Sequence, residues 1–262
     1  MWKWLTAKIV QIIGLEDFPM VKSGDNLAEI IVKTAEKNGV EIEDGDIIVV
    51  SQKIVSKAEG RIVRLSDATP SVEAEELAEE TGRDPRLLEF VLRETNHVVK
   101  ASREIVIVED KRGLVCINAG IDKSNVKGKD CYSLLPENPD ESARKIRNEI
   151  MALTRKKVAV IICDTYSRPF RKGQVEFAIG IAGLKPFKDY RGQMDLFGNL
   201  LKVKNVAIAD EIACAAELVM GQGREAIPVA IVKNVERAEL NEKSTVKDLF
   251  ISSQEDLFRG TL

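Results

Sequence analysis

The stretch KVAVIIC, residues 157–163, decides the fold, and Asp164 and Thr165 follow it directly. A continuous apolar run of this length is typical of a strand that is buried on both faces of a sheet. The run DIIVVS at Asp46–Ser51 has the same character. We therefore expect two strands in the interior of a sheet.

The elements predicted around these strands alternate irregularly along the chain. Amphipathic spacing and capping residues predict helices at residues 24–39, Ser71–Thr81, Pro85–Thr95, Asp140–Leu153 and Asp210–Met220. Apolar runs predict further strands at Ala7–Ile13, at Pro228–Val232, and in a hairpin of Ile105–Glu109 with Leu114–Asn118. The regular β-α-β spacing of a doubly wound sheet is missing, so we predict an α+β fold with a mixed sheet.

Length and composition are those of an ordinary globular protein. The 262 residues suit one unit, 1–262, or two closely joined lobes. A net charge of −3 gives no field that attracts nucleic acid or an anionic membrane. No stretch approaches the roughly 20 apolar residues of a membrane span, so we expect neither partner. The polar tail at residues 238–262 is expected to wrap onto a partner subunit or to stay mobile.

Cysteine and histidine offer little catalytic chemistry. The four cysteines form no CxxC pair, which argues against a zinc site, and three of them lie in apolar segments as core residues would. Their use predicts a cytoplasmic protein without a disulfide framework. The single histidine, His97, is expected at the end of a helix, so nucleophilic catalysis that needs a histidine is rejected.

Asp164 and Thr165 are the first candidates for chemistry because they follow a buried strand. Ligands tend to bind at the carboxyl edge of a sheet, and two oxygen donors suit Mg²⁺ or Mn²⁺. The alternative is a local turn or a helix cap. The next loop, residues 168–173, carries Arg168 and two more cations that could neutralise phosphate, or could be a solvated basic loop.

Two more polar stretches follow predicted strands. Residues 118–125 offer Asp122 for a metal ion and Asn125 for a base or a phosphate, with a polar turn as the alternative. Residues 51–60 carry Lys53 and Lys57, which would contact phosphate as point charges. Loops of this kind at strand ends are how a phosphate- and metal-handling cleft is usually assembled.

The helix at Asp210–Met220 has a simple interpretation at each end. Asp210 and Glu211 are expected to cap its start, and Gly221 and Gly223 to terminate it.

Five strings carry a closer resemblance. They are SQKIVSKAEGRIV (51–63), NAGIDKSN (118–125), DTYSRPFRKGQVEFAIGIAG (164–183), KDYRGQMDLFG (188–198) and ADEIACAAELVMGQ (209–222). From about Ile12 to about Val232, the chain resembles the CofE-type coenzyme F-420-0:gamma-glutamyl ligase family.

This resemblance implies both a fold and an activity. The family has an unusual α+β fold that assembles as an intertwined homodimer. Its members join L-glutamate by a γ-glutamyl amide linkage to the deazaflavin precursor coenzyme F-420-0, with F-420-1 as a further acceptor. They use GTP and divalent metal, here two Mg²⁺ or Mn²⁺ ions with K⁺ as a further candidate, and the reaction passes through an acyl phosphate.

The resemblance also assigns residues. The implied metal ligands are Asp122, Asp164, Thr165 and Gln222. Asp122 and Asp164, with Arg168 for its charge, are the catalytic candidates. The implied nucleotide contacts are Phe18, Pro19, Met20, Val21, Gln52, Lys53, Lys57, Asn125, Met220, Gly221, Gln222, Gly223, Arg224, Glu225, Ala226 and Ile227.

Three departures from the family pattern leave alternatives open. The position of Gln222 is commonly acidic in the family, and a neutral amide adds no charge to a second metal site. Residues 224–226 replace a more usual Asp-Gly, and the sequence diverges after Val232. A ligase with a different acceptor and a non-catalytic GTP-binding paralogue are therefore alternatives. A phosphohydrolase is disfavoured because Tyr166 stands where its second Asp would be.

Overall fold

The computed structural model describes residues 7–252 and 254–257, which group into two compact units. Unit 1 contains residues 7–20, 26–51 and 140–245, and unit 2 contains residues 21–25, 52–139 and 246–257. Among the described residues, no helix combines the length and the apolar character that crossing a membrane requires.

Unit 1 is built on a five-stranded sheet with the order β1-β12-β2-β8-β9. These strands are β1 (Gln11–Gly14), β12 (Val229–Lys233), β2 (Ile47–Ser51), β8 (Ala159–Ser167) and β9 (Gln174–Ala182). Strands β2 and β8 are parallel, and the other neighbours are antiparallel. The predicted mixed sheet is confirmed.

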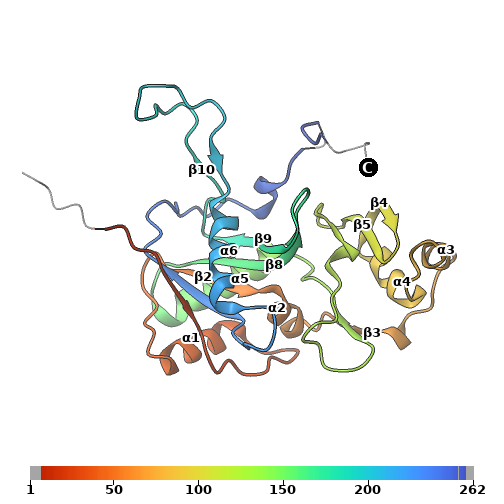
Figure 1. The fold of residues 1–262 in the computed structure, drawn as a ribbon. Helices are drawn as coiled ribbons and strands as arrows, with labels where there is room; N and C mark the ends of the chain where they lie inside the picture. Colours follow the sequence, from red (N-terminus) through yellow and green to blue (C-terminus); the bar gives the residue numbers. More distant parts are fainter. Residues whose placement is uncertain (1–6, 253, 258–262) are drawn as a thin grey trace, which may run out of the picture. The chain divides into compact units, whose positions relative to one another are not determined.

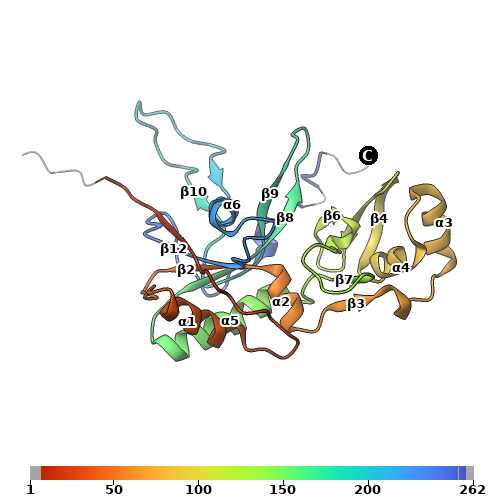
Figure 2. The same ribbon diagram turned by 60° about the horizontal axis from the view of Figure 1, so that its bottom comes forward.

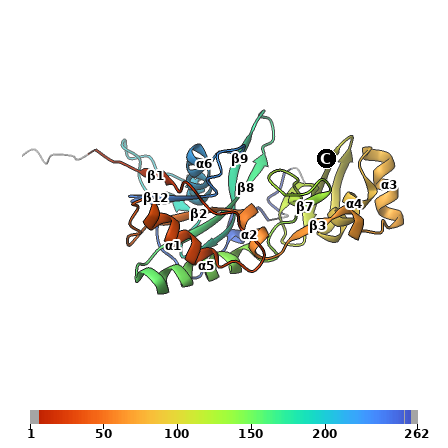
Figure 3. The ribbon, with the colours of Figure 1, turned by 90° about the horizontal axis from the view of Figure 1, so that it is seen from below.

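The two apolar stretches form the central strands, as their composition predicts. Residues 47–50 of β2 and 159–163 of β8 are each at most 1% exposed. Three helices cover the sheet: α1 (Leu27–Lys37), α5 (Pro139–Thr154) and α6 (Ile208–Met220). Figures 2 and 3 show α1 and α5 on one face and α6 on the other, which explains why both faces of the central strands are buried.

An arm extends from the base formed by β10 (Lys188–Asp189) and β11 (Asn205–Val206) (Figure 1). The two strands are antiparallel, and a bridge between Met194 and Leu200 continues the pairing towards the tip. Asp195 accepts hydrogen bonds from the backbone N–H groups of Phe197 and Asn199, which fixes the turn.

Unit 2 combines short helices with two small sheets. Its helices are α2 (Gln52–Ala58), α3 (Val72–Thr81) and α4 (Pro85–Arg93), with single 3-10 turns η1 (Leu65–Asp67), η2 (Asn118–Gly120) and η3 (Val246–Leu249). One sheet has the order β4-β5-β6, from β4 (Thr95–Ser102), β5 (Ile105–Asp110) and β6 (Val115–Ile117). The other pairs β3 (Ile62–Arg64) with β7 (Cys131–Ser133).

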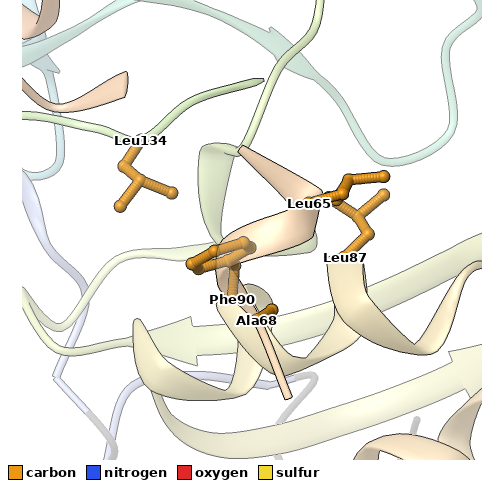
Figure 4. Close-up of a cluster of buried hydrophobic side chains, with 5 residues drawn as sticks. All are labelled: Leu65, Ala68, Leu87, Phe90 and Leu134. Carbon is orange, nitrogen blue, oxygen red and sulfur yellow. The ribbon is translucent and has the colours of Figure 1, made fainter. Parts of the chain in front are cut away.

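A cluster of buried side chains packs the interior of unit 2 (Figure 4). It contains Leu65, Ala68, Leu87, Phe90 and Leu134. The residues come from η1 and the residue that follows it, from α4 and from the segment after β7, so the cluster joins parts of the chain that are far apart in sequence. Burial of such apolar side chains supplies the main driving force for folding this small unit.

Several predicted boundaries are confirmed within a few residues. Asn26 caps α1, Ser71 caps α3 and Asp84 caps α4, each by accepting a hydrogen bond from a backbone N–H of the first turn. The predicted hairpin forms as β5 and β6. The first strand is shorter than predicted, because its pairing with β12 begins only at Gln11.

The prediction for His97 is wrong. Helix α4 ends at Arg93, and His97 lies in β4 opposite Glu109 of β5. The β-branched residues Thr95 and Val98, which follow Glu94, pair with β5, and this tertiary pairing overrides the helical spacing that suggested a longer helix.

The beginning of the polar tail packs on unit 1. Leu240 forms a bridge with Leu184, and Glu239 accepts hydrogen bonds from Lys185 and Lys188. Glu242 forms a two-bond ion pair with the buried Arg147. Residues 239–242 therefore belong to the body of unit 1.

Candidate functional site

Asp164 and Thr165 lie inside β8, and the prediction that they follow the end of a strand is wrong. Strand β9 pairs with β8 as far as Ser167, so the backbone stays extended beyond the apolar stretch. The register between the strands shifts between Ile162 and Cys163. Such a bulge bends a strand and re-aims its side chains, and it stands directly before the two predicted ligands.

Thr165 belongs to a three-residue cluster with Glu176 and Gln222. The Oγ1 atom of Thr165 lies 2.8 Å from Oε1 of Glu176 and 2.9 Å from Oε1 of Gln222. The Nε2 atom of Gln222 donates to the same Glu176 oxygen at 2.6 Å. Thr165 and Glu176 are direct partners across β8 and β9, and Gln222 reaches them from the loop after α6.

Glu176 was missed at the level of sequence. It is only 5% exposed, although a carboxylate is rarely buried without partners. The signal that could have revealed it is the composition of β9: the strand reads QVEFAIGIA, and its one acid stands directly before the apolar run FAIGIA. A buried acid beside such a run needs a polar partner, and here Thr165 and Gln222 supply it.

Burial and negative charge affect the side chains around this cluster. Burial, together with the negative charge of Glu176, raises the pKa of the Cys163 thiol well above its usual value. Burial also raises the pKa of Asp210. Asp210 does not cap α6 as predicted; its carboxylate accepts a hydrogen bond from the backbone N–H of Ala178 in β9 instead, and no side chain caps the helix at Ala207.

The basic loop forms the turn between β8 and β9. The guanidinium of Arg168 donates to the carbonyl of Lys172 across this turn. The buried Nε atom of Arg168 has no hydrogen-bond partner within the described part of the chain. Phe170 is 89% exposed at the tip, with a left-handed φ of 62°. Arg168 is thus held next to the strands that carry Thr165 and Glu176.

The loop after α6 closes on itself. Gly221 ends the helix with a φ of 66°, and its N–H donates to the carbonyl of Glu217, as the predicted C-cap requires. The carboxylate of Glu225 accepts a hydrogen bond from the N–H of Gly223 at 2.7 Å. Of the residues predicted in this loop, Gln222 is the one brought into contact with Thr165.

In unit 2, the predicted strand-end loop is the helix α2. Gln52 is 1% exposed; its Oε1 accepts from the hydroxyl of Ser56, and its Nε2 has no hydrogen-bond partner among the residues that the structure describes. Burial and the charge of Lys53 lower the pKa of Lys57. The helix therefore presents a buried amide donor and a destabilised ammonium group, both of which an anion would stabilise.

Asp122 is already engaged by a cation from this chain. Its carboxylate accepts hydrogen bonds from the ammonium of Lys53 and from the hydroxyl and the backbone N–H of Ser124. Burial opposes ionisation, but these donors outweigh it and lower the pKa of Asp122. Two residues predicted for different ligands, Lys53 for nucleotide and Asp122 for metal, thus form one ion pair.

The predicted residues divide between the two units. Unit 1 holds Phe18, Pro19, Met20, Asp164, Thr165, Arg168 and Met220 through Ile227, and unit 2 holds Val21, Gln52, Lys53, Lys57, Asp122 and Asn125. Within unit 1 the structure joins Thr165 with Gln222, and within unit 2 it joins Lys53 with Asp122. Asn125 has a left-handed φ of 54° in the polar turn.

The donor atoms in unit 1 fit a hard divalent cation. In the described residues, no group of three or more His, Cys, Asp or Glu side chains is arranged around a common point. Thr165, Gln222 and Glu176 nevertheless bring hydroxyl, amide and carboxylate oxygens together. Mg²⁺ binds oxygen at about 2.0–2.1 Å with octahedral geometry, so neighbouring ligand oxygens lie about 2.9 Å apart.

Comparison with known proteins agrees with the resemblance that these strings carry. The family described as F420-0:Gamma-glutamyl ligase matches residues 16–234. A Coenzyme F420:L-glutamate ligase of Methanothermobacter thermautotrophicus is 43% identical over 96% of this chain and 99% of its own length. The protein of the same name from Methanocaldococcus jannaschii is 46% identical, over 96% and 97%.

A third relative, from Archaeoglobus fulgidus and again named Coenzyme F420:L-glutamate ligase, is 42% identical over 97% of this chain and 98% of its own length. The match extends through both units and includes β8, β9 and the loop after α6. The chain belongs to the F420-0:gamma-glutamyl ligase family.

Proposed function

We propose that this chain is a GTP- and divalent-metal-dependent ligase that adds L-glutamate to coenzyme F-420-0 by a γ-glutamyl amide linkage, with F-420-1 as a further acceptor. The observation that carries the proposal is the near-full-length similarity to relatives named Coenzyme F420:L-glutamate ligase, at 42–46% identity. The oxygen cluster at Thr165 supports binding of a divalent metal ion. The buried amide donor of Gln52 on α2, which has no partner among the described residues, supports binding of GTP.

The proposed nucleotide contacts in unit 2 rest on α2. An unsatisfied buried donor costs about 1–3 kcal/mol, and an acceptor on GTP would remove that cost at Nε2 of Gln52. Burial and the charge of Lys53 lower the pKa of Lys57, and the negative charge of a phosphate beside it would favour its charged form. Because of these two effects, Gln52 and Lys57 favour the binding of an anion more than they would if both side chains were exposed to water.

The proposed metal ligands are Asp122, Asp164, Thr165 and Gln222. When bound, divalent ions would offset the negative charge that develops on the phosphates. The residues of this chain have their own tasks: Thr165 and Gln222 offer neutral oxygens, and Arg168 provides a planar guanidinium for a phosphate or carboxylate.

The proposed reaction has two displacements. A carboxylate oxygen of the acceptor attacks the γ-phosphorus of GTP, and the bond to the bridging oxygen breaks, so that GDP leaves with the electron pair. The amine of glutamate then attacks the carbonyl carbon of the acyl phosphate. The carbon–oxygen bond to phosphate breaks, inorganic phosphate leaves, and the nitrogen releases its proton to solvent.

We further propose that the protein is a homodimer, as the resemblance implies, and that it is cytoplasmic, as its use of cysteine predicts. The arm supports the dimer, because its tip exposes Leu196 by 97% and Phe197 by 89%. Two large neighbouring apolar side chains on a turn fixed by Asp195 are typical of a surface that another protein covers.

The test of the activity is incubation of the purified chain with GTP, Mn²⁺, L-glutamate and coenzyme F-420-0. We expect GDP and a product heavier by one glutamate. Asp164→Asn is expected to abolish turnover through loss of a charged ligand. Glu29→Gln, which removes an exposed acid on α1, serves as the control and should keep full activity.

The contrary outcomes are equally concrete. GTP binding without GDP or product would refute the ligase and favour the non-catalytic GTP-binding alternative. Undiminished turnover by Asp164→Asn would refute the role of that residue.

A further inference from the structure

Glu176 lies at the centre of the cluster in unit 1, yet it is not among the proposed metal ligands. Its Oε1 atom is within hydrogen-bond distance of both Thr165 and Gln222, and its side chain is buried on β9. A buried carboxylate with two such partners either stabilises the fold alone or orients the groups that it touches.

The protons of the cluster decide between these roles. The Thr165 hydroxyl carries one proton and has two acceptors in reach, Glu176 and Gln222. An ionised carboxylate accepts more strongly than an amide carbonyl, so this proton points to Glu176. The Nε2 group of Gln222 also donates to Glu176. The carboxylate therefore takes a hydrogen bond from each neighbour.

This arrangement leaves two oxygens face to face. Oγ1 of Thr165 and Oε1 of Gln222 are 2.9 Å apart, and no proton lies between them once both groups donate to Glu176. Two oxygen lone pairs at this distance repel unless a positive charge binds both. The separation equals that of neighbouring ligands around Mg²⁺, about 2.9 Å for bonds of 2.0–2.1 Å.

We infer that Glu176 is a positioning residue: it fixes the Thr165 hydroxyl and the Gln222 amide so that both oxygens face one divalent cation, and it supplies the negative charge that Gln222 lacks. The inference rests on the proposed metal-dependent function. Partners of metal ligands act in this way in many sites, where they fix the orientation of the ligand.

The test measures metal binding directly. Mn²⁺ is titrated into the full chain with a non-hydrolysable GTP analogue, and free Mn²⁺ is followed by electron paramagnetic resonance. We expect Glu176→Gln to weaken Mn²⁺ binding by about 10- to 100-fold, because removal of such a partner typically has an effect of that size. The matched control is Asp140→Asn, which also alters a buried carboxylate that accepts from β9, at the N–H of Ile181.

The outcomes separate the inference from a structural role and from the activity. Mn²⁺ affinity within about twofold of the native chain in Glu176→Gln would overturn the inference, as would a native chain that binds no Mn²⁺. An equal loss in Asp140→Asn would also overturn it, because the effect would then reflect buried charge in general. Native Mn²⁺ binding without ligase product would refute the activity and leave the inference standing.

A second variant covers the case in which Glu176→Gln does not fold. The double variant Glu176→Gln with Gln222→Glu, called the exchange variant, swaps the two side chains and so keeps one carboxylate and one amide in the cluster. We expect it to fold and to bind Mn²⁺ within a few-fold of the native chain. A folded exchange variant that has lost Mn²⁺ binding would contradict the inference.

Discussion

At the scale of single residues, the chemistry of this protein depends on which polar groups are buried together. Lys53 forms an ion pair with Asp122. On the same helix, burial and the like charge of Lys53 disfavour the charged form of Lys57 and lower its pKa. Both lysines belong to the seven-residue helix α2, so their different surroundings follow from their positions on that helix. Lys57 therefore responds more strongly than Lys53 to the arrival of an anion.

The state of Lys57 predicts a pH dependence. Its pKa in the folded protein is below the ordinary value of 10.5, so the unfolded chain binds more protons between the two values. Lys57 therefore lowers the free energy of unfolding at neutral pH, and this unfavourable effect diminishes as the pH rises towards 10.5. We expect Lys57→Met to raise the free energy of unfolding at neutral pH, and the difference from the native chain to shrink with rising pH.

Urea unfolding at a series of pH values measures this effect. Lys33→Met, at an exposed lysine that pairs with Glu29 on α1, is the control and should show no comparable gain. A Lys57→Met variant that is less stable than the native chain at neutral pH would contradict the prediction. GTP affinity should fall in Lys57→Met, since the variant loses a positive charge near the proposed phosphate position.

At the scale of elements, close backbone packing joins α5 to the end of the sheet. Arg147 of α5 is 4% exposed, and its Nε donates to the carbonyl of Val158. Gly183 follows β9 with a φ of +79°, and a Cβ atom there would lie 2.2 Å from Nε of Arg147. Only glycine allows both this conformation and this approach.

Gly183→Ala is expected to lower the free energy of unfolding by roughly 2–5 kcal/mol, from left-handed strain and overpacking together. Gly45→Ala is the matched control: its φ is +89°, and nothing lies within 4 Å of its added Cβ. It should cost about 1–2 kcal/mol from strain alone. Equal losses in urea unfolding of the two variants would show that Arg147 moves away freely.

At the scale of the whole molecule, the arm of residues 188–206 carries several of the most exposed large apolar side chains among the described residues. Met194 and Val203 on the same arm are 65% and 88% exposed. The hydrogen bonds of Asp195 hold the tip in one conformation, so little order would have to be created on association.

We predict that Leu196→Asp combined with Phe197→Asp converts the proposed homodimer into a monomer. Burying two carboxylates in an interface is strongly unfavourable, whereas in the free arm they remain in water. Light scattering coupled to size exclusion gives the mass. Val72→Asp, at an exposed apolar residue in the first turn of α3, should leave the mass unchanged. A native chain of monomer mass would refute the homodimer, and an unchanged mass in the double variant would refute the arm as its contact.

Much of the fold follows from local sequence. The apolar stretches at 47–50 and 159–163 predict the central strands, and helix starts are predicted within a few residues of the observed caps, because these signals depend on neighbours in sequence. The strings around Asp122 and Thr165 similarly indicate the family through the order of their residues alone. Local signals also mislead: α2 was expected as a loop, and His97 at a helix end.

The sequence by itself therefore determined the mixed α+β class, most helix boundaries and the family. Only the tertiary structure decided that β8 continues through Asp164 and Thr165, that Glu176 faces Thr165, and that Lys53 neutralises Asp122. The physical reason is the range of the interactions. Apolar periodicity and capping act between neighbours in sequence, whereas strand register and buried hydrogen bonds join residues that are tens of positions apart and leave no local pattern.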